Sequence, residues 1–222
     1  MVTAAVASDL GQVLAPRERR RRNREQMVSA ILDAARAVMQ ERGVSALSLR
    51  EVARRVKMQA PSLYEYFPSK AALYDALFLA GFRAFQARLL QALEGQATFW
   101  DQLQAILEAY MGFSREHPDL YQILFEHQVP GFAPSEETMA EGLALLDRIT
   151  GLFAEAIERG EIAPGVSAGE ARDLFIAITH GLTSQHLAND GDAPPGGGRY
   201  GGLVAPALAL FRASWTPQGG RS

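Results

Sequence analysis

The chain has 222 residues, of which 48% are hydrophobic and 21% are charged, and it contains no cysteine. This length suits a small domain joined to a larger one, and the lack of cysteine excludes disulfide frameworks and thiolate metal sites. No stretch is long and apolar enough for a membrane span, and the amino terminus does not match a signal peptide, so we expect a cytoplasmic protein without a membrane partner.

The formal charge of −3 is unevenly distributed. Residues 1–70 hold 13 Lys or Arg and 7 Asp or Glu, whereas residues 71–222 hold 9 and 18. A basic amino-terminal region on an acidic remainder favours binding of a polyanion through one end of the molecule.

The first 21 residues are expected to form a disordered basic arm. Residues 1–16 are small and polar and bury too little surface to offset the entropy of ordering. A run of arginines follows over residues 17–24. Such a run is either a solvated charge cluster or an arm that contacts nucleic acid.

Three predicted helices follow this arm. Residues 25–42 place apolar side chains three and four positions apart, and Gly43 ends the helix. A second helix begins at Ser48, whose hydroxyl forms a predicted capping box with Glu51. A third, short helix covers about residues 59–67.

One side of the third predicted helix is left free. Leu63 and Phe67 point inward against the second helix, whereas Pro61, Ser62 and Tyr64 point outward. By periodicity alone, the pattern fits either an ordinary corner between two helices or a helix-turn-helix unit that presents its second helix to DNA.

The rest of the chain reads as further amphipathic helices without strand alternation. A loop is expected over residues 127–134 and a flexible, Gly-rich connection over residues 190–202. The remaining helices are predicted over residues 70–90, 98–113, 120–125, 135–160, 169–188 and 203–215.

The predicted fold is therefore all-α. It joins an amino-terminal three-helix region, residues 22–70, to a larger helical region, residues 71–215. Residues 1–21 and 216–222 are expected to be disordered.

Two motifs in the amino-terminal region carry a family resemblance. The run S-L-R-E-V-A-R-R-V begins at Ser48, and A-P-S-L-Y-E-Y-F-P-S-K begins at Ala60. Together with the apolar helix that follows, they resemble the amino-terminal domain of the TetR/AcrR family of transcriptional repressors. The resemblance covers about residues 22–80. It implies that residues 22–70 form a helix-turn-helix domain that binds a double-stranded DNA operator, and that residues 71–215 form a helical ligand-binding and dimerisation domain.

The resemblance also implies a role for each polar position. Ser48 and Lys70 would hold phosphates from either side, and Tyr64 and Tyr66 would pack against the DNA backbone. The residues nearest the base edges would be Gln59, Ala60, Pro61 and Ser62. The full set of expected DNA-binding residues is Arg22, Arg24, Ser48, Arg50, Gln59, Ala60, Pro61, Ser62, Tyr64, Tyr66 and Lys70.

Three positions affect how the family pattern transfers. The family often has Gly where Lys57 stands and Ser or Thr where Gln59 stands. Glu65 is acidic and faces outward, so a phosphate would repel it unless a cytosine amino group donates to it. The base preference is therefore left open. Next to a recognition helix, the arginine run is interpreted as an arm that reaches a minor groove.

The carboxy-terminal part shares shorter motifs with an effector domain found in one branch of the family. These are H-P-D-L-Y-Q-I-L-F from His117 and T-H-G-L-T-S from Thr179, where the branch normally has Trp-His-Gly in place of Thr179-His180-Gly181. The resemblance implies a small hydrophobic effector whose binding releases DNA. The helix over residues 70–90 would transmit the change, because it joins the DNA-binding region to the effector region. The expected effector-binding residues are Tyr110, Phe113, Tyr121, Phe125, Met139 and His180.

A homodimer is expected because a single DNA-binding domain of this size contacts few phosphates. The predicted interface uses residues 137–159 and 169–188, whose small side chains permit close approach. The alternative is that these helices complete the core of one chain.

Other functions are weighed against this one. We find no nucleophile motif, phosphate loop or H-E-x-x-H, so we expect no enzyme, and the four histidines lack metal-ligand spacing. No cofactor is expected. The runner-up is an architectural protein that binds DNA without sequence preference and has no effector.

Overall fold

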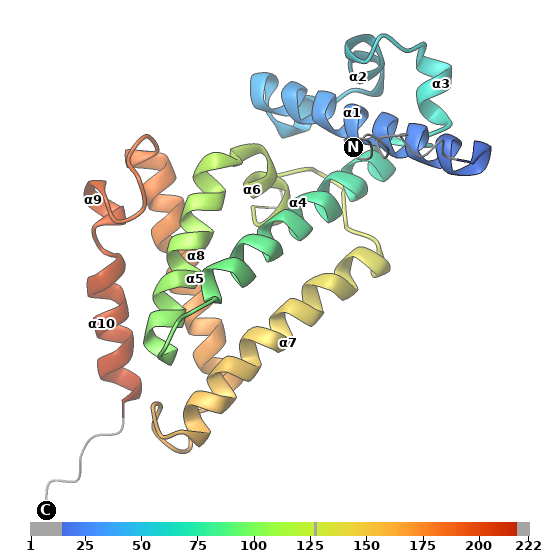
Figure 1. Cartoon of the computed structure of the whole chain (residues 1–222). Coiled ribbons are helices and arrows are strands. Elements are labelled where there is room, and N and C mark those ends of the chain that lie inside the picture. The colour runs from blue at the N-terminus through green and yellow to red at the C-terminus, as the bar shows by residue number, and fades with distance from the viewer. Residues whose placement is uncertain (1–14, 127, 217–222) are drawn as a thin grey trace, which may run out of the picture.

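The computed structural model describes residues 15–126 and 128–216, and every regular element within them is a helix (Figure 1). The expected all-α fold is confirmed. None of these helices has the length and apolarity needed to cross a lipid bilayer. The elements are α1 Pro16–Arg42, the 3₁₀ turn η1 Val44–Ala46, α2 Leu49–Arg55, α3 Ala60–Tyr64, α4 Lys70–Leu93, α5 Phe99–Glu116, α6 Pro118–Leu124, α7 Glu136–Glu158, α8 Ala168–Asp190, α9 Gly198–Gly201 and α10 Val204–Trp215.

We call α1, η1, α2 and α3 the head and α4 to α10 the body. In the head, Ile31, Ala35 and Val38 of α1 are fully buried, as their spacing along one helix face predicts. Leu63 of α3 is also fully buried, and the small side chain of Ala53 lets α2 approach closely. This packing holds α2 and α3 in place on α1.

Helix α1 begins earlier than expected. The structure places Pro16 at its start, so residues 16–24 are helical, and the prediction of a disordered arm over residues 1–21 is wrong for the part of it that is described. Residues 1–14 lie outside the described residues. Proline suits a first helical turn, and Arg21 pairs with Glu25 one turn later at 3.5 Å.

The predicted capping box at α2 does not form. Ser48 occupies the N-cap position, but its hydroxyl accepts no hydrogen bond there. The Glu51 carboxylate instead accepts hydrogen bonds from Arg54, at 3.0 and 2.7 Å, and from Arg55, at 3.3 Å. These cationic partners outcompete a neutral backbone amide.

Four helices of the body have serine or threonine caps at the expected positions. The hydroxyl of each cap residue accepts a hydrogen bond from the backbone amide three residues later, which satisfies a free donor of the first turn. The caps are Ser69 for α4 (3.0 Å), Thr98 for α5 (3.1 Å), Ser135 for α7 (3.3 Å) and Ser167 for α8 (3.3 Å).

Helix α4 joins the head to the body (Figure 1). Its first turn lies beside η1, where the Tyr74 hydroxyl donates to the Val44 carbonyl at 2.6 Å. Farther along, α5 packs against α4, while α7 and α8 pack against each other, and α10 packs on α5 at the carboxy-terminal end. The body is therefore a helical bundle that α4 enters from the head.

The Gly-rich segment 190–202 is not the flexible connection that its composition predicted. The Asp190 carboxylate accepts hydrogen bonds from the backbone amides of Arg199, at 2.8 Å, and Tyr200, at 3.2 Å. Gly201 is buried, and a β-carbon there would lie 3.1 Å from the His186 ring. Glycine therefore serves close packing of α9 against α8.

Candidate nucleic-acid interface and effector cavity

The turn between α2 and α3 sets the position of the recognition helix. The Met58 amide donates to the Ala53 carbonyl at 2.9 Å, and the Lys57 amide donates to the Arg54 carbonyl at 3.2 Å. This pair of bonds defines a Schellman motif, in which Lys57 takes a left-handed conformation with φ of 55°. The position at which the family often has glycine is thus one that favours glycine.

Helix α3 exposes one face and buries the other. Leu63 is fully buried and Phe67, just after the helix, is 6% exposed, and both side chains hold α3 in the core of the head. Gln59 and Pro61 are exposed at its start, and Tyr64 is 52% exposed at its end. Exposed polar groups beside a flat tyrosine ring are suited to a nucleic-acid groove and its phosphate edges.

Hydroxyl and ammonium groups flank this face. Ser48 is exposed and its hydroxyl is not used as a cap. Lys70 lies at the start of α4, where its Nζ donates to the Ser45 carbonyl at 3.1 Å and sits 5.4 Å from the centre of the Tyr74 ring. These contacts position the ammonium group while leaving the residue exposed.

The arginine run meets the recognition helix at Arg24. Its Nη2 donates to the Glu65 carbonyl at 3.3 Å, and its guanidinium lies 4.8 Å from the centre of the Tyr66 ring. Arg24 therefore braces the carboxy-terminal end of α3 against α1. Arg22 is exposed on α1, and Arg50 is exposed on α2.

Acidic groups of the head are held by arginines on the side formed by α1 and α2. Hydrogen bonds from Arg54 lower the pKa of Glu51 to about 2, with a further contribution from Arg55. Arg55 also lowers the pKa of Glu41 through a bidentate ion pair. These pairs neutralise the carboxylates of the head and leave its basic charge dominant.

A second candidate site is a cavity of about 380 Å³ inside the body. Residues from α4 through α8 form its wall, and they are almost all apolar. The lining residues are Phe82, Phe85, Leu89, Ile106, Tyr110, Leu124, Phe125, Gly142, Leu145, Leu146, Ile149, Phe175, Ile176, Thr179 and His180. A cavity of this size and composition suits a small apolar ligand.

Three of the six expected effector residues line the cavity: Tyr110, Phe125 and His180. The other three lie outside its wall. Phe113 faces a groove between α4 and α5, Tyr121 faces a cleft beside α8, and Met139 is 43% exposed on α7. Aromatic and methionine content alone does not distinguish the faces of a helix.

The polar part of the wall comes from α5 and α8. The Tyr110 hydroxyl and His180 Nδ1 are 3.0 Å apart, and the Tyr121 ring stacks on the His180 ring with centres 5.9 Å apart. Thr179 is 4% exposed, and its hydroxyl has no partner among the described residues. Burial raises the pKa of Tyr110 far above its usual range, so its hydroxyl stays neutral.

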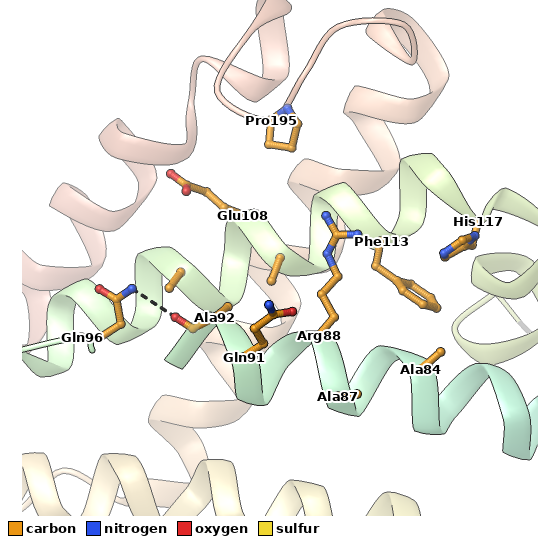
Figure 2. Close-up of a pocket in the computed structure, with 12 residues that line it drawn as sticks. Ala84, Ala87, Arg88, Gln91, Ala92, Gln96, Glu108, Phe113, His117 and Pro195 are labelled. Atoms are coloured by element: carbon orange, nitrogen blue, oxygen red, sulfur yellow. Dashed lines mark hydrogen bonds between the residues drawn. The ribbon is translucent and has the colours of Figure 1, made fainter. Parts of the chain in front are cut away.

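The groove between α4 and α5 is larger, about 760 Å³, but it lies on the outside of the two helices (Figure 2). Short alanine side chains form much of its floor. Arg88 crosses it to pair with Glu116 on α5, at 2.5 Å, and Pro195 overhangs it from the segment after α8 (Figure 2). We assign no function to this groove.

Helix α6 connects the cavity to the head. Leu124, at its end, lines the cavity, whereas Asp119, at its start, points to α1 and has a fully buried side chain. The Asp119 carboxylate accepts hydrogen bonds from Arg36 Nε (2.8 Å), Arg36 Nη2 (3.2 Å) and Gln40 Nε2 (3.1 Å). A shift of α6 would therefore act on α1 of the head through Arg36 and Gln40.

Comparison with known proteins identifies this combination of head and body. Residues 31–77 match the family described as bacterial regulatory proteins, tetR family, and residues 103–196 match the tetracyclin repressor-like, C-terminal domain. The chain belongs to the TetR family.

The proteins similar to this TetR-family chain include transcriptional regulators. HTH-type transcriptional regulator Rv1816 of Mycobacterium tuberculosis is 29% identical over 175 residues, which cover 78% of this chain and 69% of that protein. A protein of unknown function from Rhodococcus sp. RHA1 has a similar structure, with a TM-score of 0.73, 26% identity and coverage of 86% of this chain and 96% of that chain.

A second similar structure is that of AibR in complex with isovaleryl coenzyme A and operator DNA. Its TM-score is 0.62 at 19% identity, with coverage of 82% of this chain and 96% of that chain. At this identity the likeness concerns the fold. The family matches and the relatives together establish the chain as a TetR-family transcriptional regulator.

Several cavity residues of this TetR-family regulator were not among those expected from its sequence. Phe82, Phe85 and Leu89 lie three and four positions apart on α4, and this spacing marked them as one buried face. The sequence does not indicate that this face borders a cavity, because that depends on how far α7 lies from α4.

Proposed function

We propose that this regulator is a repressor that binds a palindromic operator as a homodimer and is released by a small hydrophobic ligand. The observation that carries the proposal is the course of α4. Its first residue, Lys70, belongs to the flank of the recognition face, and Phe82, Phe85 and Leu89 form one wall of the cavity. A ligand that shifts this helix changes the position of the head.

Base reading in this proposal belongs to the start of α3. Gln59 and Pro61 are exposed, while Ala60 and Ser62 are half-buried beside them. A glutamine amide can pair with adenine through two hydrogen bonds in the major groove. Ser48, Arg50 and Lys70 supply the surrounding phosphate contacts, which fix the register of the head on the duplex.

The arginine run contributes in a different way from an extended arm. A minor groove is about 6 Å wide and an α-helix is about 10–12 Å across with its side chains. Because Arg17 to Arg24 are helical, they cannot enter a minor groove as an arm would. We assign them to phosphates beside the major groove, where they add affinity for any sequence.

Exposed apolar side chains support a dimer. On α8, Leu174 and Ile176 are 44% and 43% exposed. Leu203, which caps the start of α10, and Leu210, within α10, are 42% and 72% exposed. The exposed side of α10 carries few charges, as expected of an interface core. We therefore favour α8 with α10 as the interface.

The interface first predicted combined α7 with α8. The exposed surface of α7 carries Asp147, Arg148 and Glu155 among its residues, and charged residues are depleted from interface cores. Helix α8 is common to both arrangements. Paired heads bind two half-sites with higher affinity than one head, because the second contact becomes intramolecular.

Release by an effector requires a ligand that prefers the conformation in which the heads are wrongly spaced. The cavity supports such a ligand, since it borders α4 and α6, the two helices that contact the head. AibR, a protein of similar fold, has been crystallised with both isovaleryl coenzyme A and operator DNA, so this fold can accommodate a small molecule as well as DNA.

Selection of bound fragments from a random DNA pool tests this function. We expect one palindromic sequence to be enriched and to resist competition by random DNA. An architectural protein without sequence preference, the alternative, would enrich no sequence and would lose its DNA to the competitor.

Two substitutions separate base reading from phosphate binding in the same assay. Gln59→Ala should change which sequence is selected. Lys70→Ala should weaken binding to every sequence and reduce the salt slope by about 1. An unchanged selected sequence in Gln59→Ala would contradict the assignment of base reading to the start of α3.

A further inference from the structure

The wall of the body cavity carries information on the chemistry of its ligand. This inference rests on the proposed function, in which the cavity holds the effector. At roughly 30 Å³ for each non-hydrogen atom, the volume of about 380 Å³ holds about a dozen such atoms. A complete acyl coenzyme A therefore does not fit inside.

The polar part of the wall can donate hydrogen bonds to a ligand. When the Tyr110 hydroxyl donates to His180 Nδ1, the Nε2 of that ring carries a proton that it can donate. In the other tautomer His180 donates to Tyr110, and the tyrosine hydroxyl keeps its own proton for a ligand. The pair therefore has one N–H or O–H to spare in either arrangement.

Thr179 adds a second donor beside this pair. Its hydroxyl lines the cavity wall and is buried without a partner in the described parts of the chain. An unsatisfied buried hydroxyl costs free energy, which a ligand with a hydrogen-bond acceptor would recover.

Charge at this end of the cavity disfavours an anion. No lysine or arginine is among the lining residues. The Glu126 carboxylate lies close enough to raise the pKa of both Tyr110 and Tyr121, after the larger effect of burial. A buried carboxylate or phosphate would thus lack a fixed cationic partner and would be repelled by Glu126.

We infer that the effector is a neutral, mainly apolar molecule of about a dozen non-hydrogen atoms that carries a hydrogen-bond acceptor, such as an ester or ketone carbonyl, held by His180, Tyr110 and Thr179. This class differs from an acyl coenzyme A, whose phosphates would need cations.

Calorimetry of the full chain with three probes of similar length tests the inference. Methyl nonanoate has a neutral ester, decanoate is its charged counterpart with the same heavy atoms, and decane has no polar group. We expect the ester to bind about tenfold more tightly than either of the others, since one net hydrogen bond is worth about that factor. Decanoate or decane binding as tightly as the ester, or no binding of the ester, would overturn it.

Substitutions of the lining residues assign the effect to the named side chains. Tyr110→Phe on α5, combined with His180→Phe and Thr179→Val, removes all three donors and keeps the shape of the wall, so ester affinity should fall toward that of decane. Ile149→Val, at a buried lining residue of α7, changes only the apolar wall and should affect the three probes alike. Thr179→Val alone is the test where the triple variant fails to fold, and it should lower ester affinity without changing that of decane. Unchanged ester preference in the donor variants would overturn the assignment.

The effect of methyl nonanoate on operator binding separates this inference from the proposed function. If the ester binds as expected but leaves operator affinity unchanged, release by an effector is wrong and the chemical class of the cavity ligand stands. If decanoate binds preferentially and releases DNA, the proposed function stands and the neutral class is wrong.

Discussion

Lys57 holds a left-handed backbone conformation that its β-carbon disfavours. With φ of 55° at the C′ position of α2, the residue occupies a place where glycine has no steric penalty. Lys57→Gly should therefore stabilise the chain by about 0.5–1 kcal/mol, which is the left-handed penalty less the greater entropy of glycine in the unfolded state. Denaturant titration followed by circular dichroism measures the change.

Lys57→Ala is the matched control for this prediction. It removes the same charge and the same long side chain but keeps the β-carbon, so its stability should stay close to that of the natural chain. Equal stabilisation by alanine and glycine would mean that the lysine charge, and not its backbone conformation, is responsible.

Residue orientations were predictable where they depend on local spacing. Leu63 and Phe67 are buried, and Tyr64 is exposed, as helical periodicity indicated. The partners of polar side chains were not predictable in this way. Glu51 accepts hydrogen bonds from Arg54 and Arg55 instead of forming a capping box with Ser48. A charged donor within reach outcompetes the backbone amide at the start of α2.

At the scale of elements, composition alone leads to wrong predictions for two segments. Residues 16–21 have no apolar face, which predicts disorder, although Pro16 and Glu18 at the start of α1 are typical of a first helical turn. The glycines of segment 190–202 likewise predict a flexible connection. Gly201 is required for contact with His186, a partner that only the folded chain brings near.

Helix α6 carries the next prediction because its Asp119 binds the head. Asp119→Asn removes the negative charge and replaces one carboxylate oxygen with an amide nitrogen, which cannot accept a hydrogen bond from Arg36 or Gln40. We expect a loss of about 1.5–3 kcal/mol in the free energy of unfolding, the range for a hydrogen bond to a charged group. Chemical denaturation at neutral pH measures it.

The same substitution should change the response to acid. Burial alone would raise the pKa of Asp119, but the hydrogen bonds from Arg36 and Gln40 and the charge of Arg36 outweigh burial and lower it. A lowered pKa stabilises the fold above the ordinary aspartate pKa of about 3.9, and this stability is lost as the pH falls through the lowered value. The difference between Asp119→Asn and the natural chain should therefore shrink toward low pH.

Glu116→Gln provides the control for both measurements. Its ion pair with Arg88 is partly exposed and joins α4 to α5 within the body, so its loss should change stability by less than about 1 kcal/mol. A loss at Glu116 as large as that at Asp119 would contradict a special role for the contact between α6 and the head.

For the whole molecule, function depends on two heads held at a fixed distance. Leu174 on α8 and Leu210 on α10 are large, apolar and exposed in the single chain, and our dimer covers both. Leu174→Glu and Leu210→Glu each bring a charge into that contact, where it would be desolvated without a partner. Each should convert the dimer to a monomer, as light scattering coupled to size-exclusion chromatography would record.

Loss of the dimer should weaken operator binding about a hundredfold or more, because the effective concentration that couples the two half-sites disappears. Binding to a single half-site should change little, since the recognition face of each head is intact. Leu143→Glu on α7 is the matched control, for Leu143 is 55% exposed and lies outside the interface of α8 with α10. A monomer produced by Leu143→Glu, with dimers retained in Leu210→Glu, would instead place the contact on α7 and α8.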